Sequence, residues 1–266
     1  MKTVHFTEQY LLNPQHEITV ALIGAGGTGS QVLSCLGRMN TALNMLGHPG
    51  LFVTVYDPDV VTPSNMGRQL FTEQDAGLNK SACLVTRINR FFGTDWDSVS
   101  EKYGGQAANI VITCTDNISS RLYVHEVFHV KHEGSRYFQP YEKKMYWLDF
   151  GNSRTTGQVV LGSLEIKQPV SEKFKTVSRL PFVTELFDYS IIDEKESGPS
   201  CSLAEALQKQ DLFINSTLAQ LGCDLLWKLF RECMIEYNGI FLNLDTMKIN
   251  PLKIRNETQK SPHGHD

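Results

Sequence analysis

Residues 18–30, Ile-Thr-Val-Ala-Leu-Ile-Gly-Ala-Gly-Gly-Thr-Gly-Ser, decide how this chain is expected to fold. The first six residues form a short apolar run rich in β-branched side chains, typical of a strand buried in a parallel sheet. Gly24, Gly26 and Gly29 follow with the spacing G-x-G-x-x-G, ahead of an apolar helical pattern. A strand, a glycine turn and a helix in this order predict a nucleotide-binding unit, because glycines let the backbone approach phosphates at a helix N-terminus.

The alternation of strands and helices continues along the chain. Buried strands are predicted over 51–56 and 109–115, and helices over 80–92 and roughly 120–132, closed by Gly134. This order predicts an α/β fold with a doubly wound, mostly parallel Rossmann-like sheet. Strands over 146–150 and 158–161 indicate an antiparallel C-terminal extension of that sheet. The remaining expectations are a long loop over 165–200, helix over 203–235, a last strand over 240–244 and a disordered tail over 255–266.

Composition narrows the class of protein. The 266 residues carry a formal net charge of -4, which disfavours nucleic acid as the main ligand. The first 17 residues lack the apolar core of a signal peptide, and no apolar run reaches membrane-spanning length, so we expect a cytoplasmic protein without a membrane anchor. None of the six cysteines forms a CxxC pair, which argues against a zinc knuckle.

Acidic residues follow the predicted strands at the edge where ligands bind in such sheets. Asp57 ends the second strand, and Asp116-Asn117 follows the third. A carboxylate in the position of Asp57 can accept hydrogen bonds from ribose hydroxyls, although it could also be a turn residue ahead of Pro58. The shared edge of Gly24, Asp57 and Asp116 therefore predicts a ligand site.

Two cations separate this pattern from that of a dinucleotide dehydrogenase. Arg68 lies in the segment after the second strand, and Lys80 begins the next predicted helix. A guanidinium and an ammonium suit a polyphosphate. Because the helix dipole disfavours a cation at a helix start, an anion is expected to compensate Lys80; the alternative is a solvated surface lysine.

Four motifs in this order resemble those of the ThiF/MoeB family of ubiquitin-activating-type enzymes. They are residues 24–30, 57–69, 75–80 and 116–117. More narrowly, LGHPGL at 46–51, FFGTDW at 91–96 and SCSLAEALQKQDLFIN at 200–215 resemble the ThiF-like proteins of bacterial PRTRC gene systems.

The resemblance implies an enzyme that binds ATP and Mg²⁺ and adenylates the C-terminal glycine of a small ubiquitin-like or sulfur-carrier protein. It implies that Lys80 and Arg68 neutralise the reacting phosphates and that Asp116 holds the metal, while Asp59 orients Arg68. The expected nucleotide-binding residues are Gly24, Gly26, Gly27, Gly29, Asp57, Asp59, Ser64, Asn65, Arg68, Gln69, Lys80, Asp116 and Asn117. Asp116 could instead cap the helix that follows it, and Arg121 is expected to be structural.

The resemblance also implies a single adenylation domain over 1–266. Its nucleotide-binding half would span 1–135, and a carrier-binding and dimer half 136–254, with a mobile loop over 165–202. Cys201 precedes a predicted helix, where a thiol is more acidic and nucleophilic; it would take the acyl group as a thioester or persulfide, unless it is an inert loop cysteine. A homodimer and a conjugating-enzyme-like partner are the expected associations.

Two departures from the family and three alternatives remain open. Residues 1–17 contain no arginine that a partner subunit could donate, only Lys2, and the family's CxxC…CxxC zinc site is absent. The alternatives are a non-catalytic nucleotide-binding dimer, an NAD-dependent oxidoreductase that rests on the glycine turn and Asp57, and a zinc peptidase. The last rests on the HExxH match from His125 to His129, which also fits an amphipathic helix.

Overall fold

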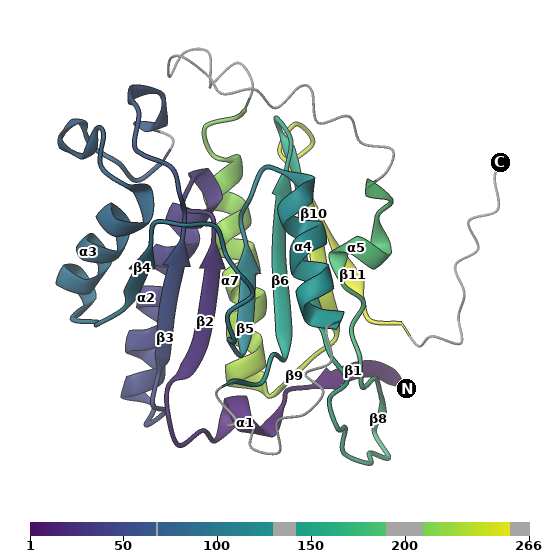
Figure 1. Cartoon of the computed structure of the whole chain (residues 1–266). Helices are drawn as coiled ribbons and strands as arrows, with labels where there is room; N and C mark the ends of the chain where they lie inside the picture. The colour runs from purple at the N-terminus through teal and green to yellow at the C-terminus, as the bar shows by residue number, and fades with distance from the viewer. Residues whose placement is uncertain (68, 130–141, 190–209, 256–266) are drawn as a thin grey trace.

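The computed structural model describes residues 1–67, 69–129, 142–189 and 210–255. Within those ranges the centre of the molecule is an eight-stranded sheet with the order β11-β10-β7-β6-β5-β2-β3-β4 (Figure 1). Its strands are β2 (Ile18–Ile23), β3 (Leu51–Tyr56), β4 (Asp97–Val99), β5 (Ile110–Thr113), β6 (Tyr146–Asn152), β7 (Thr156–Ser163), β10 (Tyr237–Asn243) and β11 (Lys248–Lys253).

The strand directions confirm the expected fold class. From β4 to β6 every neighbouring pair is parallel, whereas β6, β7, β10 and β11 pair antiparallel. The chain is therefore an α/β protein with a mostly parallel sheet and an antiparallel C-terminal extension.

Helices cover both faces of the sheet. Two short helices, α4 (Ile118–His129) and α5 (Val183–Leu186), lie in front in Figure 1, while α2 (Gly27–Met45), α3 (Lys80–Phe92) and α7 (Ile214–Glu232) lie on the other face. The sequence of β2 is apolar because both of its faces are covered by helices. Val20 and Leu22 pack with α2 and α7, and Ala21 and Ile23 pack on the face covered by α4.

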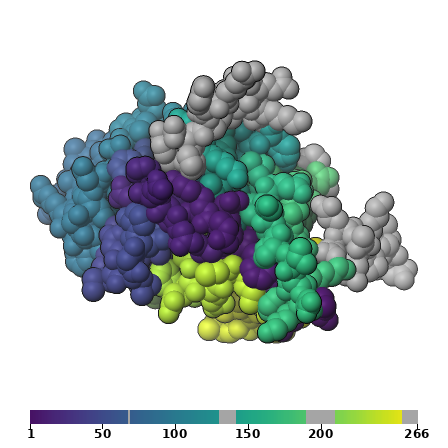
Figure 2. Space-filling view, turned by 90° about the horizontal axis from the view of Figure 1, so that it is seen from below, coloured from purple at the N-terminus to yellow at the C-terminus, as the bar shows by residue number. Residues whose placement is uncertain are grey.

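A second, three-stranded sheet lies at the end of the molecule where the parallel strands begin. Its order is β8 (Phe174–Thr176), β1 (Lys2–Phe6) and β9 (Met234–Ile235), and the one-turn helix α1 (Gln9–Leu12) follows β1. Figure 2, which views the molecule from below, shows the purple N-terminal residues in the middle of this end, beside yellow-green residues of the C-terminal part. The N-terminal strand is thus paired with two later segments of the chain.

Several elements differ from the sequence-based expectation. The expected loop over 165–200 contains β8 and α5 in its described part, and Leu180, Phe182 and Val183 are buried there. Helix α7 begins at Ile214, and residues 210–213 are not helical. The edge strand β11 was not expected because it is polar and exposed and contains a proline, a residue tolerated at sheet edges.

Residues 256–266 of the tail expected over 255–266, the end of the helix at Gly134 and the helical pattern over 203–209 lie outside the described residues. Across the described ranges, no helix combines the length and the apolar character needed to cross a membrane.

Buried His5 makes the stability of this fold depend on pH. Its Nδ1 donates to the carbonyl of Val177 at 2.7 Å, and its Nε2 accepts from the Tyr146 hydroxyl at 3.1 Å. The bond from Tyr146 requires the neutral imidazole, and burial, which outweighs the opposing effect of the bond to Val177, lowers the pKa of His5 to about 4. A histidine whose pKa is lowered by folding contributes stability above its unfolded pKa of about 6.5, and this is lost as the pH falls toward 4.

We therefore expect the free energy of unfolding to fall by about 2 kcal/mol between pH 7.5 and pH 5 on account of His5. Urea unfolding at both pH values, with the wild type and with His5→Gln, checks this expectation. The variant should lose that part of the pH dependence; equal pH dependence in both proteins would contradict the assignment.

Candidate nucleotide site at the carboxyl edge of the sheet

The glycine turn between β2 and α2 is held in place by close backbone contacts. A Cβ on Gly29 would lie 1.9 Å from the carbonyl oxygen of Gly24, and one on Gly24, which has φ +92°, would lie 2.8 Å from the carbonyl oxygen of Cys114. A Cβ on Gly26 would meet nothing within 4 Å. Gly24 and Gly29 are thus required by the fold, whereas Gly26 faces open space at the turn.

The carboxylate of Asp57 joins this turn to the end of β3. One oxygen accepts from the amide of Ala25 at 2.6 Å and the other from the amide of Asp59 at 2.8 Å. Burial raises the pKa of Asp57, while these two amides and the nearby Lys80 oppose the rise. In this structure Asp57 fixes the backbone of the turn, and a bond to a ribose would use its remaining lone pairs.

Lys80 lies beside the same turn in a buried position. It is only 8% exposed, and its Nζ lies 2.8 Å from a carboxylate oxygen of Asp59, whose side chain is 64% exposed. Asn79 caps α3 by accepting from the amide of Ala82 at 3.0 Å, and it donates to the carbonyl of Asp57 at 2.8 Å. The anion expected beside Lys80 is therefore Asp59 in this structure; Asp59 was expected to orient Arg68 instead.

The segment after β3 returns to the glycine turn. Asn65 accepts from the amide of Thr62 at 2.9 Å, and the Ser64 hydroxyl lies 2.9 Å from that of Thr62, so both side chains stabilise a local turn. The amide of Leu70 donates to the hydroxyl of Ser30 at 3.4 Å. The preceding Gln69 is buried, and its side-chain oxygen has no partner among the described residues. Arg68 lies outside the described residues.

Asp116 and Asn117 have different roles at the end of β5. Asn117 caps α4, accepting from the amide of Ser120 at 2.8 Å and from the hydroxyl of Ser119 at 3.1 Å. Asp116 is exposed, and its carboxylate makes no hydrogen bond or ion pair with the rest of the described chain. The expected alternative, in which Asp116 caps the helix, is wrong because Asn117 does so.

A buried ion pair behind this loop was not expected from the sequence. Arg121 donates from Nε to Asp149 at 2.9 Å and from Nη2 to the carbonyls of Thr115 and Phe150, both at 2.8 Å. Arg121 was expected to be structural, and these bonds agree with that view because they hold the residue that precedes Asp116. The signal for Asp149 was an acidic residue in the middle of the otherwise apolar strand β6.

Asn215 on α7 is a second contact that sequence analysis missed. Its side-chain oxygen accepts from the hydroxyl of Thr28 at 2.9 Å, and a Cβ on Gly27 would lie 2.7 Å from its amide nitrogen. The N-termini of α2 and α7 therefore meet at the glycine turn, which brings the C-terminal third of the chain to the site.

The histidines of the HExxH match bond to residues outside this cluster. The rings of His125 and His129 lie 4.2 Å apart on α4, where His125 bonds to Thr184 and His129 to the carbonyl of His125. No group of three or more histidine, cysteine or acidic side chains that could hold a metal occurs in the described ranges. Cys201 lies outside them.

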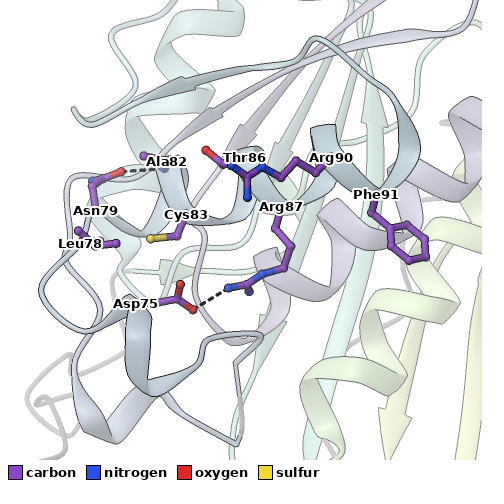
Figure 3. Close-up of a pocket in the computed structure, with 9 residues that line it drawn as sticks. All are labelled: Asp75, Leu78, Asn79, Ala82, Cys83, Thr86, Arg87, Arg90 and Phe91. Carbon is purple, nitrogen blue, oxygen red and sulfur yellow. Dashed lines mark hydrogen bonds and ion pairs between the residues drawn. The ribbon is translucent and has the colours of Figure 1, made fainter.

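An open groove of about 670 Å³ lies on the outer side of α3 (Figure 3). Its lining residues are Asp75, Leu78, Asn79, Ala82, Cys83, Thr86, Arg87, Arg90 and Phe91. Arg87 and Asp75 form an ion pair of 2.6 Å across it. Neither Lys80 nor the glycine turn lines this groove, although Asn79, which bonds to the carbonyl of Asp57, does.

The sequence pattern of the ThiF family matches residues 8–263, and the chain belongs to that family. It is 24% identical over 171 residues to ubiquitin-like modifier-activating enzyme 5 of Drosophila sechellia, covering 56% of this chain and 36% of that protein. The same enzyme of Drosophila grimshawi is 26% identical over 172 residues, covering 56% of this chain and 37% of that protein. The chain thus spans little more than a third of the length of these curated relatives.

Solved structures share the fold. The E. coli MccB structure with ATP superposes with a TM-score of 0.56 at 16% identity, covering 92% of this chain and 65% of that chain. A further E. coli MccB structure gives a TM-score of 0.56 at 17% identity, covering 97% of this chain and 69% of that chain.

Two alanine substitutions test which glycines of the turn the fold requires. We expect Gly29→Ala to destabilise the protein by about 1–3 kcal/mol or more, because its Cβ would collide with the Gly24 carbonyl. Gly26→Ala is the matched control and should change the free energy of unfolding by less than about 0.5 kcal/mol. Chemical unfolding of both variants measures the difference; a stable Gly29→Ala protein would contradict the geometry of the turn.

Proposed function

We propose that this ThiF-family chain is an adenylyltransferase that uses ATP and Mg²⁺ to activate the C-terminal glycine of a small ubiquitin-like or sulfur-carrier protein. The family membership supports this proposal. So do the names of the similar proteins, an activating enzyme for a ubiquitin-like modifier and a structure solved with ATP. The resemblance to PRTRC-type ThiF proteins directs the search for the carrier to small Gly-ending proteins encoded beside this chain.

The observation that carries the proposal is a buried lysine beside an open glycine turn. Lys80 is almost fully buried, yet its partner Asp59 is largely exposed and can move away. A triphosphate at Gly26 would offer Lys80 a stronger anionic partner in a site of low dielectric. The buried side-chain oxygen of Gln69 has no donor among the described residues, so this position still requires a hydrogen-bond donor.

The exposed Asp116 fits a magnesium ligand. Mg²⁺ prefers carboxylate oxygens and is usually held by one or two of them together with phosphates and water, so an unengaged carboxylate at a strand end is the donor it requires. When bound, the ion would neutralise part of the phosphate charge.

In the proposed reaction, the carrier's terminal carboxylate attacks the α-phosphorus of ATP, and pyrophosphate leaves. Negative charge grows on the phosphate oxygens, where Lys80 and Arg68 would stabilise it. The backbone amides of the turn would contact the nucleotide, and Asp57 would keep them in position. Transfer of the acyl group to Cys201, and from there to a conjugating-enzyme-like protein, is the further step that we propose.

A homodimer forms part of the proposal because a second subunit could add a cation. Lys2, the basic residue of the first 17, lies in β1 and pairs with Glu236 at 2.7 Å. That pair is in the small sheet where the parallel strands begin, at the opposite end from the glycine turn. Lys2 therefore does not serve the site of its own chain.

A nucleotide-binding dimer without catalysis is the second candidate function. The absence of arginine from residues 1–17 favours it. In that case ATP would bind with an affinity set by the same Lys80 and glycine turn, but no ATP–pyrophosphate exchange would follow.

ATP–pyrophosphate exchange by the wild type and by Lys80→Met distinguishes the adenylyltransferase from the binding dimer. We expect Lys80→Met to lower carrier-dependent ATP–pyrophosphate exchange about 100-fold, since one buried cation facing the developing phosphate charge is worth about 2.7 kcal/mol. Arg90→Ala, a cation on the exposed side of the same helix, is the control and should leave the exchange rate unchanged. Exchange that is equal in Lys80→Met and wild type would refute the assignment, and no exchange by the wild type with any Gly-ending carrier would favour the binding dimer.

Asp116→Asn tests the metal ligand. We expect the Mg²⁺ concentration for half-maximal exchange to rise about tenfold, while the thermal unfolding midpoint stays unchanged because the carboxylate is exposed. Asp224→Asn, which removes an exposed carboxylate on α7, should leave the Mg²⁺ dependence as it is. A Mg²⁺ titration that superposes on that of the wild type would show that Asp116 does not hold the ion.

A further inference from the structure

Two cysteines meet where α2 packs against α7. Cys35 is 3% exposed and Cys223 is 5% exposed, and neither is in a disulfide. Gln220, which lies one turn before Cys223 on α7, donates to the sulfur of Cys35 at 3.3 Å, and each of the two thiols perturbs the pKa of the other. The two cysteines are therefore neighbours although they are almost 190 residues apart in sequence.

The sulfur of Cys35 is surrounded by donors. Arg38 donates to it from Nη2 at 3.2 Å, and Gln220 donates from Nε2 at 3.3 Å. Arg38 and Gln220 also bond to each other at 3.0 Å, which holds both donors in place. These two donors on one sulfur favour the thiolate, the nucleophilic form of cysteine.

The other described cysteines with perturbed acidity behave in the opposite way. Burial raises the pKa of Cys83 and of Cys114, and the bond to Cys35, together with burial, raises that of Cys223. The bonds from Cys223, Arg38 and Gln220 outweigh burial at Cys35 and lower its pKa to about 6. Cys35 is thus the more acidic thiol of the pair and Cys223 the less acidic one.

We propose that Cys35 and Cys223 form a peroxide-reactive dithiol that is converted reversibly into a disulfide linking α2 to α7. The Cys35 thiolate attacks one oxygen of a hydroperoxide; the O–O bond breaks, and the other oxygen leaves with a proton as water or an alcohol. The resulting sulfenic acid is attacked by the sulfur of Cys223, an S–S bond forms, and water leaves. The two thiols lose two electrons and the peroxide gains them, and an added dithiol reverses the change.

The position of this pair connects it to the nucleotide site. Helix α2 begins in the glycine turn, and α7 begins beside Asn215, which bonds to Thr28 of that turn. The disulfide would therefore join the two helices whose N-termini meet there. The proposal itself does not depend on the proposed adenylation.

The test uses the full chain and one equivalent of hydrogen peroxide. We expect peptide mapping to detect a Cys35–Cys223 linked peptide, with the loss of two hydrogen atoms in mass, in the wild type and in Cys201→Ser. Cys83→Ser, a half-buried cysteine in the α3 groove, should form the same link. Cys223→Ser should stop at a sulfenic acid on Cys35 that a 1,3-dione traps, and Cys35→Ser should give neither product.

Arg38→Ala keeps the proposal testable if the cysteine variants fold poorly, because Arg38 is exposed. Loss of this donor should raise the pKa of Cys35, and a rise of one unit would slow alkylation of Cys35 at pH 6 about fivefold. Oxidation of other cysteines while Cys35 and Cys223 stay reduced would overturn the proposal. So would an alkylation rate at Cys35 that is the same in Arg38→Ala and wild type.

Discussion

The carboxylate of Asp57 bonds to two backbone amides, those of Ala25 and Asp59, that belong to different loops at one edge of the sheet. Its two oxygens thereby fix the glycine turn relative to the end of β3. The loop that begins at Asp59 leads to Lys80, whose amide donates to the carbonyl of Asp59 at 2.9 Å and whose ammonium bonds to the Asp59 side chain. The positions of the turn and of the buried cation thus both depend on Asp57.

A corresponding clamp holds the neighbouring loop from inside the sheet. Arg121 and Asp149 are both buried, and Nη2 of the guanidinium also donates to the carbonyls of Thr115 and Phe150. A buried ion pair of this kind contributes little net stability, but loss of one partner is costly because it leaves an uncompensated charge. The pair fixes the backbone next to Asp116, so the position of the exposed carboxylate is well defined.

The sequence predicted those helices and strands whose apolar pattern lies within the element itself. The helix over 80–92 was predicted with its observed bounds from its amphipathic pattern, and in the structure Asn79 caps its start and Gly93, at φ +69°, ends it. Strands β2 and β3 were predicted because both are short and mainly apolar runs, and most of their residues are buried. The polar edge strands β4 and β11 were not, since neither carries an apolar pattern.

The sequence predicted which residues belong to the candidate site better than it predicted their contacts. Its glycines, Asp57, Lys80 and Asp116 could be named from motifs, and the structure brings the first three together. Tertiary packing between different segments of the chain brings Lys80 to Asp59 and Asn215 to Gly27. No periodicity within a single segment carries that information.

The small sheet has a consequence for the order in which the chain becomes structured during synthesis. Strand β1 pairs Lys2 with Phe174 and His5 with Ile235. Strand β1 therefore stays without its neighbours until residues 174–176, and then residues 234–235, have been synthesised. Pairing at such long range is slow to form and leaves an unsatisfied strand edge in the meantime, so this end of the molecule is where a nascent chain would most need a chaperone.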